Sequence, residues 1–176
     1  MLYLTALRDL IILRRVTMGA EAITMFRGEY SFLSNFYILE TPLPENAIFK
    51  TRSHPLFYFA TSEHAYVACK TDNEEIRRYI ASLYKPGEVK RYGRSIDIVD
   101  NWDDIRQACM WDVLYAKFTF NPHLKEKLLA TGDRELVEGN WHGDKYWGVC
   151  MRTGEGSNHL GRMLMELRDY FRDIEE

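Results

Sequence analysis

Cysteine is scarce in this chain, and the cysteines that occur are far apart in the sequence. Cys69, Cys109 and Cys150 form no C-x-x-C pair, so neither a disulfide framework nor a zinc knuckle is indicated. The five histidines also lack the spacing of a zinc site. We therefore expect a protein that needs no metal or other cofactor and that works in the reducing cytoplasm.

The chain also has no excess of positive charge and no apolar run of membrane-spanning length. Its 23 Lys and Arg against 26 Asp and Glu give a formal net charge of −3. This balance argues against binding nucleic acid through overall charge but leaves local basic clusters open. The N-terminal stretch MLYLTALRDLIILRRV is interrupted by Arg8 and Asp9, so we expect neither a signal peptide nor a membrane span.

The length of 176 residues favours a single domain. A chain of this size, with 46% apolar residues, can bury a core without disulfides or metals. We expect the domain at residues 25–176, and residues 1–24 as an extension with Leu4, Leu7 and Ile11 on one face of a short amphipathic helix. Either this helix packs on the domain or binds a partner, or the segment results from a misassigned translation start. The sequence leaves that choice and the oligomeric state open.

Helix signals dominate the rest of the chain. Thr61 or Ser62 can cap a helix that runs to about Lys70, and Thr71 with Glu74 has the spacing of a capping box for the next helix. Further helices are expected at about 86–94, 102–119, 122–131 and 158–174, and YILETPLPENAIFKT predicts a β-hairpin that turns at PLPEN. The prediction is a mainly α single domain with a small antiparallel β element.

Residues 138–158 are rich in Gly and show little periodicity, so we expect a loop. Long loops in compact domains are usually functional. Asp144 lies in the stretch NWHGDKYWGV, where Gly143 and Gly148 permit close approach of the backbone and Trp147 offers a stacking face. The loop either holds a heterocycle or sugar beside one acid, or it is a tight turn with core tryptophans.

Glu63 occupies the first turn of the helix expected in TSEHAYVACK. The helix N-terminus stabilises a carboxylate there, and many exposed first-turn Glu residues have no other role. The alternative is catalysis, because a carboxylate on a rigid helix end can stabilise a developing cation or activate water. His64, next in the sequence, is more typical of a packing or hydrogen-bonding residue than of a base.

Basic residues gather in KPGEVKRYGR, where Lys85, Lys90, Arg91 and Arg94 stand against one acid. Such a cluster either holds a phosphate, particularly through an Arg fork, or is a solvated helix face. The stretch GEGSNHLG opens the last helix with three glycines and resembles a phosphate-holding helix N-terminus. No strand signal precedes it, which disfavours a dinucleotide-binding fold.

Several motifs together resemble the YbiA-like family, also called NADAR. In chain order they are FRGEYSFLSNFY, TSEHAYVACK, YGR, NW, VLYAKF, NPHLKEKLLATGDRELVE, GDKYWGV and GEGSNHLGRMLMELR. They extend over about residues 26–168, and the combination of SEH with D-x-Y-W-G and N-x-L-G-x-x-L-M makes the resemblance specific. The segment between Asn35 and Glu63 is longer than in compact members and is expected to border the site.

The resemblance implies a metal-free N-glycosidase with a mainly helical YbiA-like fold and a small β element. It would hydrolyse the C1′–N bond of a phosphorylated riboside, and ribosylaminopyrimidine 5′-phosphates of early riboflavin biosynthesis are the first candidate substrates. The alternative is an ADP-ribosyl hydrolase that acts on modified guanine bases, including those of ADP-ribosylated nucleic acid, or on NAD-derived signals. A non-catalytic ADP-ribose-binding module is the third interpretation, which the intact Glu63 and Asp144 argue against.

Carried over residue by residue, the resemblance makes Glu63 and Asp144 the catalytic carboxylates. Cleavage of a glycosidic bond passes through an oxocarbenium-like state, which Glu63 would stabilise, or whose attacking water it would activate. Asp144 would protonate the leaving nitrogen, if surrounding aromatic residues raise its pKa, or bind the ribose hydroxyls.

The resemblance also implies a set of substrate-binding residues. They are Arg27, Ser34, Asn35, Phe36, His64, Lys70, Arg94, Trp147, Gly148 and Asn158. Arg27 and Arg94 would hold the 5′-phosphate, with Lys70 and Lys117 as further candidates. Trp147 would stack on the base or the ribose, and the two asparagines would bind hydroxyls or base edges.

Overall fold

The computed structural model describes residues 21–50 and 53–174, so the helix expected within residues 1–24 lies outside the described part of the chain. The elements are the 3₁₀ helix η1 (Gly28–Leu33), β1 (Leu43–Pro44), α2 (Glu45–Phe49), β2 (Tyr58–Phe59), α3 (Ser62–Ala68), α4 (Glu74–Ser82), α5 (Pro86–Tyr92), α6 (Trp102–Phe120), α7 (Pro122–Leu129), β3 (Gly139–Asn140), β4 (Val149–Cys150) and α8 (His159–Asp173). The prediction of a mainly α fold is confirmed. No helix in these ranges is long and apolar enough to cross a bilayer.

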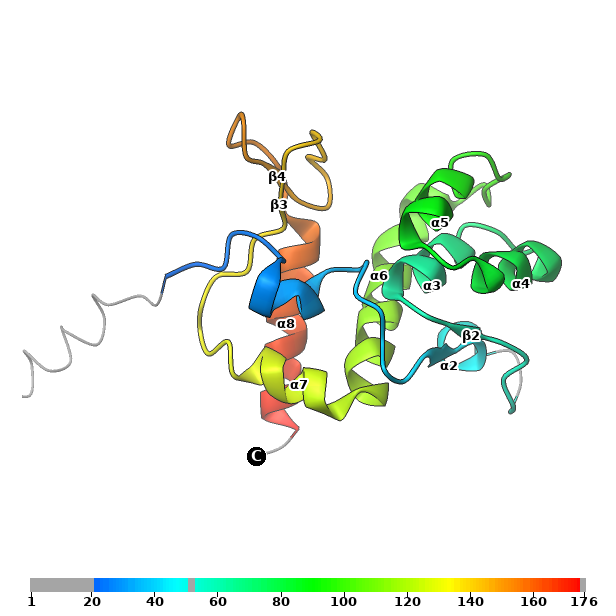
Figure 1. Ribbon diagram of the computed structural model, residues 1–176, viewed down its shortest axis with the longest axis horizontal. Coiled ribbons are helices and arrows are strands. Elements are labelled where there is room, and N and C mark those ends of the chain that lie inside the picture. The colour runs from blue at the N-terminus through cyan, green and yellow to red at the C-terminus, as the bar shows by residue number, and fades with distance from the viewer. Residues whose placement is uncertain (1–20, 51–52, 175–176) are drawn as a thin grey trace, which may run out of the picture.

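The longest helix, α6, lies at the centre of the molecule (Figure 1). Helix α3 packs against α4, α5 and α6 on one side, whereas α7 and α8 pack against each other and against the other side of α6. One face of α6 is buried at Val113 and Ala116 and half-buried at Ile105 and Cys109. Helix α6 therefore joins two helical groups that would otherwise have little contact.

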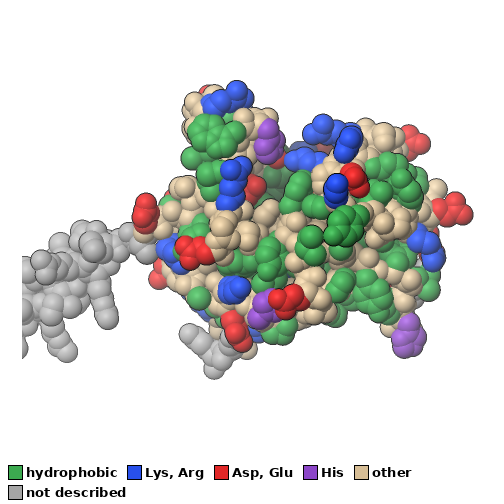
Figure 2. All heavy atoms as spheres, viewed as in Figure 1, with side chains coloured by type: hydrophobic (Ala, Val, Ile, Leu, Met, Phe, Trp, Pro, Cys, Tyr) green, Lys and Arg blue, Asp and Glu red, His purple; other side chains and the backbone are tan. Residues whose placement is uncertain are grey.

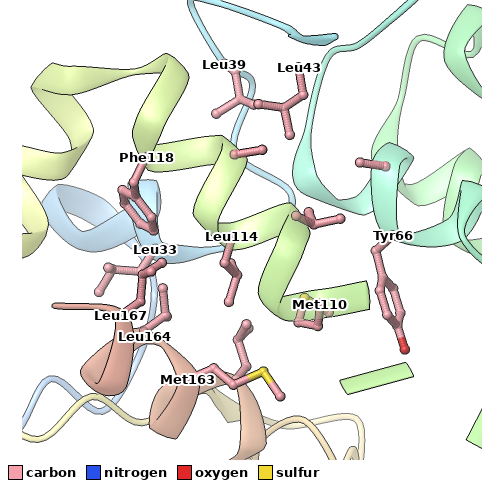
Figure 3. Close-up of a cluster of buried hydrophobic side chains, with 14 of the residues drawn as sticks. Leu33, Leu39, Leu43, Tyr66, Met110, Leu114, Phe118, Met163, Leu164 and Leu167 are labelled. Carbon is pink, nitrogen blue, oxygen red and sulfur yellow. The ribbon is translucent and has the colours of Figure 1, made fainter. Parts of the chain in front are cut away.

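The hydrophobic core lies along α6, between α8, η1 and the segment that carries β1 (Figure 3). Leu114 and Leu164 are fully buried there, and burial of such a side chain contributes about 1.5–3 kcal/mol. At the end of this cluster nearest α3 lie Met110 and Tyr66. The core thus ends at two side chains that also line the cavity described below.

Two helix starts test the predicted caps. The Thr61 cap is confirmed, because its hydroxyl accepts from the backbone N–H of His64 at 3.3 Å and pairs with the His64 ring at 2.7 Å. The capping box of Thr71 and Glu74 is wrong. Asn73 is the N-cap of α4, and its side-chain oxygen accepts from two backbone N–H groups of the first turn. The side-chain oxygen of Asn73 is closer to the helix than Thr71 and satisfies the backbone N–H donors that Thr71 was expected to cap.

The predicted hairpin around PLPEN is also wrong. Strand β1 pairs antiparallel with β2, so that Leu43 lies opposite Phe59, and helix α2 begins where the turn was expected. Pro44 favours this arrangement, because its fixed φ and missing N–H suit the position before a helix. Strands β3 and β4 form a parallel pair that the sequence did not predict.

The described part of the expected N-terminal extension is attached to the domain. Ile23 is 4% exposed and forms a parallel bridge with Leu136. Its N–H donates to Glu135 O, and its carbonyl accepts from Val137 N, both at 2.8 Å. These bonds fix the backbone immediately before β3, which is the strand that leads into the Gly-rich loop.

The close approach of α8 to the chain before β3 predicts the effect of one added methyl group. Gly161 lies in the first turn of α8, and a Cβ there would overlap the carbonyl oxygen of Leu136 and the side chain of Asn158. We expect Gly161→Ala to lower the free energy of unfolding, measured by urea denaturation, by about 1–3 kcal/mol. The matched control is Gly87→Ala in α5, where a Cβ meets nothing and stability rises by up to about 1 kcal/mol. Equal stability of the two variants would contradict this packing.

Candidate active site

One cavity of about 300 Å³ opens between the α3–α5 group and the Gly-rich loop. Figure 2 shows the surface hollowed between the loop that carries β3 and β4 and the lobe formed by α5, where Lys and Arg side chains gather. The cavity is lined by Ser34, Asn35, Phe36, Glu63, Tyr66, Val67, Lys70, Lys90, Arg94, Trp102, Arg106, Met110, Glu138, Asp144, Tyr146, Trp147 and Leu160. The structure therefore brings both predicted carboxylates and most of the predicted binding residues together.

Glu63 lies in the first turn of α3, but only 8% of it is exposed. The expectation of an exposed first-turn carboxylate is therefore wrong. The backbone N–H of Glu63 donates to Asn35 O at 2.9 Å, which ties the start of α3 to the segment after η1. Burial raises the pKa of Glu63 to about 7; the charges of Lys90 and Lys70 lower it, and that of Asp144 raises it.

Asp144 lies in the loop between β3 and β4. Its Oδ1 accepts hydrogen bonds from the backbone N–H groups of Tyr146 at 3.0 Å and Trp147 at 2.9 Å. The side chain of Asn140 holds the Asp144 backbone, accepting from its N–H at 2.9 Å and donating to its carbonyl at 2.7 Å. Both interpretations of the loop therefore hold in part. The loop is a tight turn, and this turn places the carboxylate of Asp144 at the cavity.

A third carboxyl group, that of Glu138, also lines the cavity. Burial raises the pKa of Glu138 to about 7, and the charge of Asp144 raises it further, whereas Lys90, Lys117 and Arg27 act to lower it. Among the described residues, no group of three His, Cys, Asp or Glu side chains is arranged to hold a metal ion. The three acids face one space without forming such a cluster.

Basic side chains form another part of the wall: Lys70 at the end of α3, Lys90 on α5, Arg94 just after α5, and Arg106 on α6. Burial lowers the pKa of Lys70; Glu63 acts to raise it, and the cations of Arg94 and Lys90 lower it further. Mutual repulsion of this kind is relieved when an anion binds.

The two interpretations of KPGEVKRYGR can now be separated by position. Lys90 and Arg94 line the cavity, whereas Lys85 and Arg91 do not and are exposed. The cluster is therefore partly a lining of the cavity and partly a solvated face.

Aromatic rings hold one another in place around the carboxylates. The Trp147 ring meets the rings of Tyr66 and Tyr146 edge-on, with centroids 5.4 and 5.0 Å apart. Tyr146 is in turn bound to α6, because Gln107 Nε2 donates to its hydroxyl at 2.7 Å and the Arg106 guanidinium lies 3.9 Å from its ring centroid. These contacts fix the loop against α6 and orient the Trp147 ring.

Four predicted binding residues do not line the cavity. His64 is fully buried, and its ring pairs with the Thr61 hydroxyl at 2.7 Å and with Leu83 O at 2.9 Å. Asn158 is buried too, accepting from Glu138 N at 3.0 Å and donating to Leu136 O at 2.9 Å. Both side chains are occupied by the protein itself, so the structure gives them positioning roles.

The other two predicted binding residues that lie outside the cavity lining are Arg27 and Gly148. Arg27 is exposed and outside the lining, although its charge acts on Glu138. Gly148 is buried, and a Cβ there would overlap the carbonyl oxygen of Glu138, so its hydrogen side chain permits close chain packing. Lys117, a further phosphate candidate, is fully buried and donates to Ser34 O at 3.0 Å instead.

The long segment between Asn35 and Glu63 contributes less to the cavity than expected. Of its described residues, only Phe36 lines the cavity. Helix α2 and strand β1 of this segment pack against α6, away from the carboxylates. The extra length therefore covers the core and does not line the cavity.

Helical spacing could have found several of the missed lining residues. Tyr66 and Val67 follow Glu63 at i+3 and i+4, and therefore share its face of α3. In the same way Trp102, Arg106 and Met110 recur at i, i+4 and i+8 along α6. Glu138 had no such signal, since only the fold shows that the residue before the Gly-rich loop turns toward the other acids.

Comparison with known proteins gives concordant matches. The NADAR domain family model matches residues 25–172. The N-glycosidase YbiA of Escherichia coli is 39% identical over 111 residues, which cover 62% of this chain and 68% of that protein. The chloroplastic riboflavin biosynthesis protein PYRR of Arabidopsis thaliana is 41% identical over 98 residues, which cover 52% of this chain and 16% of that protein. The NMR structure of E. coli YbiA matches with a TM-score of 0.71 at 32% identity, over 88% of each chain.

The burial of Glu63 predicts a pH-dependent effect on stability. Its pKa is raised from 4.5 to about 7, so the folded protein loses stability relative to the unfolded chain as pH rises from about 4.5 to about 7. We expect Glu63→Gln to stabilise the protein on the order of 2 kcal/mol above pH 7 and much less at pH 5, measured by urea denaturation.

The matched control is Glu75→Gln, which changes an exposed Glu in the first turn of α4. That variant should lose about 0.3–1 kcal/mol through the helix dipole. If both variants destabilise the protein equally at pH 8, Glu63 is not desolvated as described.

Proposed function

The chain belongs to the NADAR domain family and is an N-glycosidase, and we propose that it hydrolyses the C1′–N bond of a phosphorylated riboside. The observation that carries this proposal is the cavity that combines buried Glu63 with the cations of Lys70, Lys90 and Arg94. A riboside phosphate presents a phosphate dianion and, during cleavage, a cationic ribose ring. The cavity lining supplies cations for the phosphate and a carboxylate for the ribose ring.

The reaction requires a carboxylate close to C1′, and Glu63 has the properties for that role. Helix α3 and the bond to Asn35 O hold its backbone rigidly. As the C1′–N bond breaks, positive charge develops on the ribose, and ionised Glu63 stabilises it or takes a proton from the attacking water. A pKa of about 7 leaves a large fraction of Glu63 ionised near neutral pH.

The remaining lining residues position the substrate. Lys90 and Arg94 hold the 5′-phosphate. Lys90 takes the place of Arg27, which the family resemblance implied, because Lys90 lines the cavity and Arg27 does not. Trp147, whose ring is fixed by its neighbours, stacks on the base or the ribose. Asn35 Oδ1 has no hydrogen-bond partner among the described residues, so it can accept from a substrate hydroxyl.

The first candidate substrates are ribosylaminopyrimidine 5′-phosphates of riboflavin biosynthesis. Two observations support them. The cavity of about 300 Å³ matches one nucleotide-sized ligand, and a riboflavin biosynthesis protein is among the similar proteins.

The alternative substrate carries a diphosphate, as ADP-ribose attached to a nucleobase does. It is favoured by the four cations of the lining, Lys70, Lys90, Arg94 and Arg106, which exceed what one phosphate needs. The open side of the cavity seen in Figure 2 would also admit a base that belongs to a larger molecule.

One assay compares the two candidates directly. The purified protein is incubated with a ribosylaminopyrimidine 5′-phosphate and, separately, with ADP-ribosylated guanosine, and free base is quantified by chromatography. The proposal expects release of the aminopyrimidine together with ribose 5-phosphate. Release of guanosine together with ADP-ribose, without cleavage of the aminopyrimidine substrate, would assign the diphosphate substrate, and no cleavage of either would refute the proposed bond.

The role of Glu63 predicts a large loss of turnover. Glu63→Gln keeps the size of the side chain but removes its charge, so kcat should fall on the order of 10²–10⁴-fold. KM should change less, because the opposing positive charge exists fully only in the transition state. Glu75→Gln is again the control. Normal kcat in a folded Glu63→Gln protein would move the catalytic role to another acid.

The phosphate assignment predicts a selective loss of affinity. Arg94→Ala should raise KM for the phosphorylated riboside by about tenfold, because a charge-assisted hydrogen bond contributes about 1.5–3 kcal/mol. KM for the same riboside without phosphate should stay unchanged. Arg91→Ala removes an exposed cation from the same basic stretch and should alter neither value. An equal effect of Arg94→Ala on both substrates would contradict phosphate binding there.

A further inference from the structure

We propose that Glu138 is the acid that protonates the leaving nitrogen, so that the site works with Glu63 and Glu138 as its base and acid. The inference rests on the proposed N-glycosidase function and assigns a residue that the sequence did not single out. It is carried by the position of Glu138 in the cavity wall, by its fixed backbone, and by a carboxyl oxygen without a partner.

The backbone of Glu138 is fixed from two sides. Its N–H donates to Asn158 Oδ1 at 3.0 Å, and its carbonyl accepts from Val149 N at 2.9 Å. Gly148 packs directly against it, because a Cβ there would overlap the Glu138 carbonyl. Asn158 adopts a left-handed conformation with φ 51° to make this contact. Asn adopts this conformation more readily than most other non-Gly residues, so Asn158 can hold the Glu138 backbone at little cost.

The side chain of Glu138 differs from that of the nearby acid Asp144. Oε2 of Glu138 is buried and has no hydrogen-bond partner among the described residues, whereas Asp144 Oδ1 accepts two backbone N–H bonds. An oxygen that accepts two N–H groups is already occupied as an acceptor. Asp144 is thereby engaged in holding the loop, whereas Oε2 of Glu138 makes no such bond, so the acid role falls to Glu138.

Four charged residues from different segments act on the Glu138 carboxyl. Asp144 of the loop favours the protonated form, and Lys90 of α5, Lys117 of α6 and Arg27 before η1 oppose it. Burial is the largest effect, and the pKa of Glu138 is raised to about 7. A substantial fraction is thus protonated at neutral pH, as a general acid requires.

The proposed step balances in atoms, charge and electrons. The C1′–N bond breaks, its electron pair goes to the nitrogen, and the proton of the Glu138 carboxyl moves to that nitrogen. Water adds its oxygen to C1′, and ionised Glu63 takes the released proton. The products are the free amine and ribose 5-phosphate, and the two carboxyls return to their starting states by exchanging protons with solvent. Asp144 orders the loop, and its charge helps to keep the pKa values of both acids raised.

Two substrates with different leaving groups test this assignment. A ribosylaminopyrimidine 5′-phosphate needs a proton on its leaving nitrogen, whereas p-nitrophenyl riboside 5-phosphate releases a stable anion without one. Glu138→Gln should lower kcat for the aminopyrimidine substrate on the order of 10²–10⁴-fold. For the nitrophenyl substrate, kcat should change by less than about tenfold, because no proton transfer is lost. Glu63→Gln should slow both reactions.

The matched control is Glu135→Gln, which changes an exposed Glu three residues earlier and should leave both rates unchanged. Wild-type protein supplies a readout that needs no variant. For the aminopyrimidine substrate, kcat/KM should fall below about pH 7 as Glu63 is protonated and above about pH 7 as Glu138 ionises. For the nitrophenyl substrate, only the fall at low pH should remain.

The outcomes separate the inference from the function on which it rests. If the wild-type protein hydrolyses both substrates and Glu138→Gln slows them equally, or slows neither, the acid role is refuted while the proposed function stands. A wild-type profile without a fall at high pH for the aminopyrimidine substrate refutes it as well, even if Glu138→Gln does not fold. If the wild-type protein cleaves neither substrate, the proposed function fails and the inference fails with it.

Discussion

The carboxyl group of Glu63 is buried at the start of α3, and the rest of the site depends on that burial. An isolated buried carboxylate is destabilising, yet the fold places it where helix α3, the Thr61 cap and the bond to Asn35 O hold its backbone. Lys70 and Lys90 lie close enough to offset part of the desolvation, and the pKa settles at about 7. The protein thus sacrifices some stability for an acid that titrates at neutral pH, as catalytic acids and bases require.

The architecture explains how this acid meets its partners. Helix α6 joins the α3–α5 group to the α7–α8 group, and the Gly-rich loop extends beyond the N-terminal end of α8 (Figure 1). Tyr146 binds the loop to α6, and Asp144 orders the loop because its Oδ1 accepts from the backbone N–H groups of Tyr146 and Trp147. Three of the four lining cations come from the α3–α5 side, and two of the three acids come from the loop side. The cavity therefore exists only when both halves are folded together, which makes its geometry a property of the whole domain.

The sequence predicted those features that local patterns determine. The helices of the second half, the Thr61 cap and the presence of Glu63 and Asp144 in one cavity followed from periodicity, capping chemistry and a family resemblance. The α4 cap, helix α2 and the β3–β4 pair did not follow from local patterns. They depend on which neighbouring side chain caps the helix or on pairing with a strand elsewhere in the chain. The family resemblance assigned His64 to the substrate, but its ring bonds to Thr61 and Leu83 within the protein, as a packing or hydrogen-bonding histidine does. Glu138 could be found only from the fold.

The central claim is that Glu63 is a buried carboxyl group with a strongly raised pKa. Carbon-13 NMR of the side-chain carboxyl groups, recorded across a pH titration of the folded protein, measures this directly, and Glu63→Gln identifies the resonance by its disappearance. We expect the assigned carboxyl to titrate at about pH 7. A midpoint near the ordinary value of 4.5 would show that the group is solvated, and would contradict the site described here.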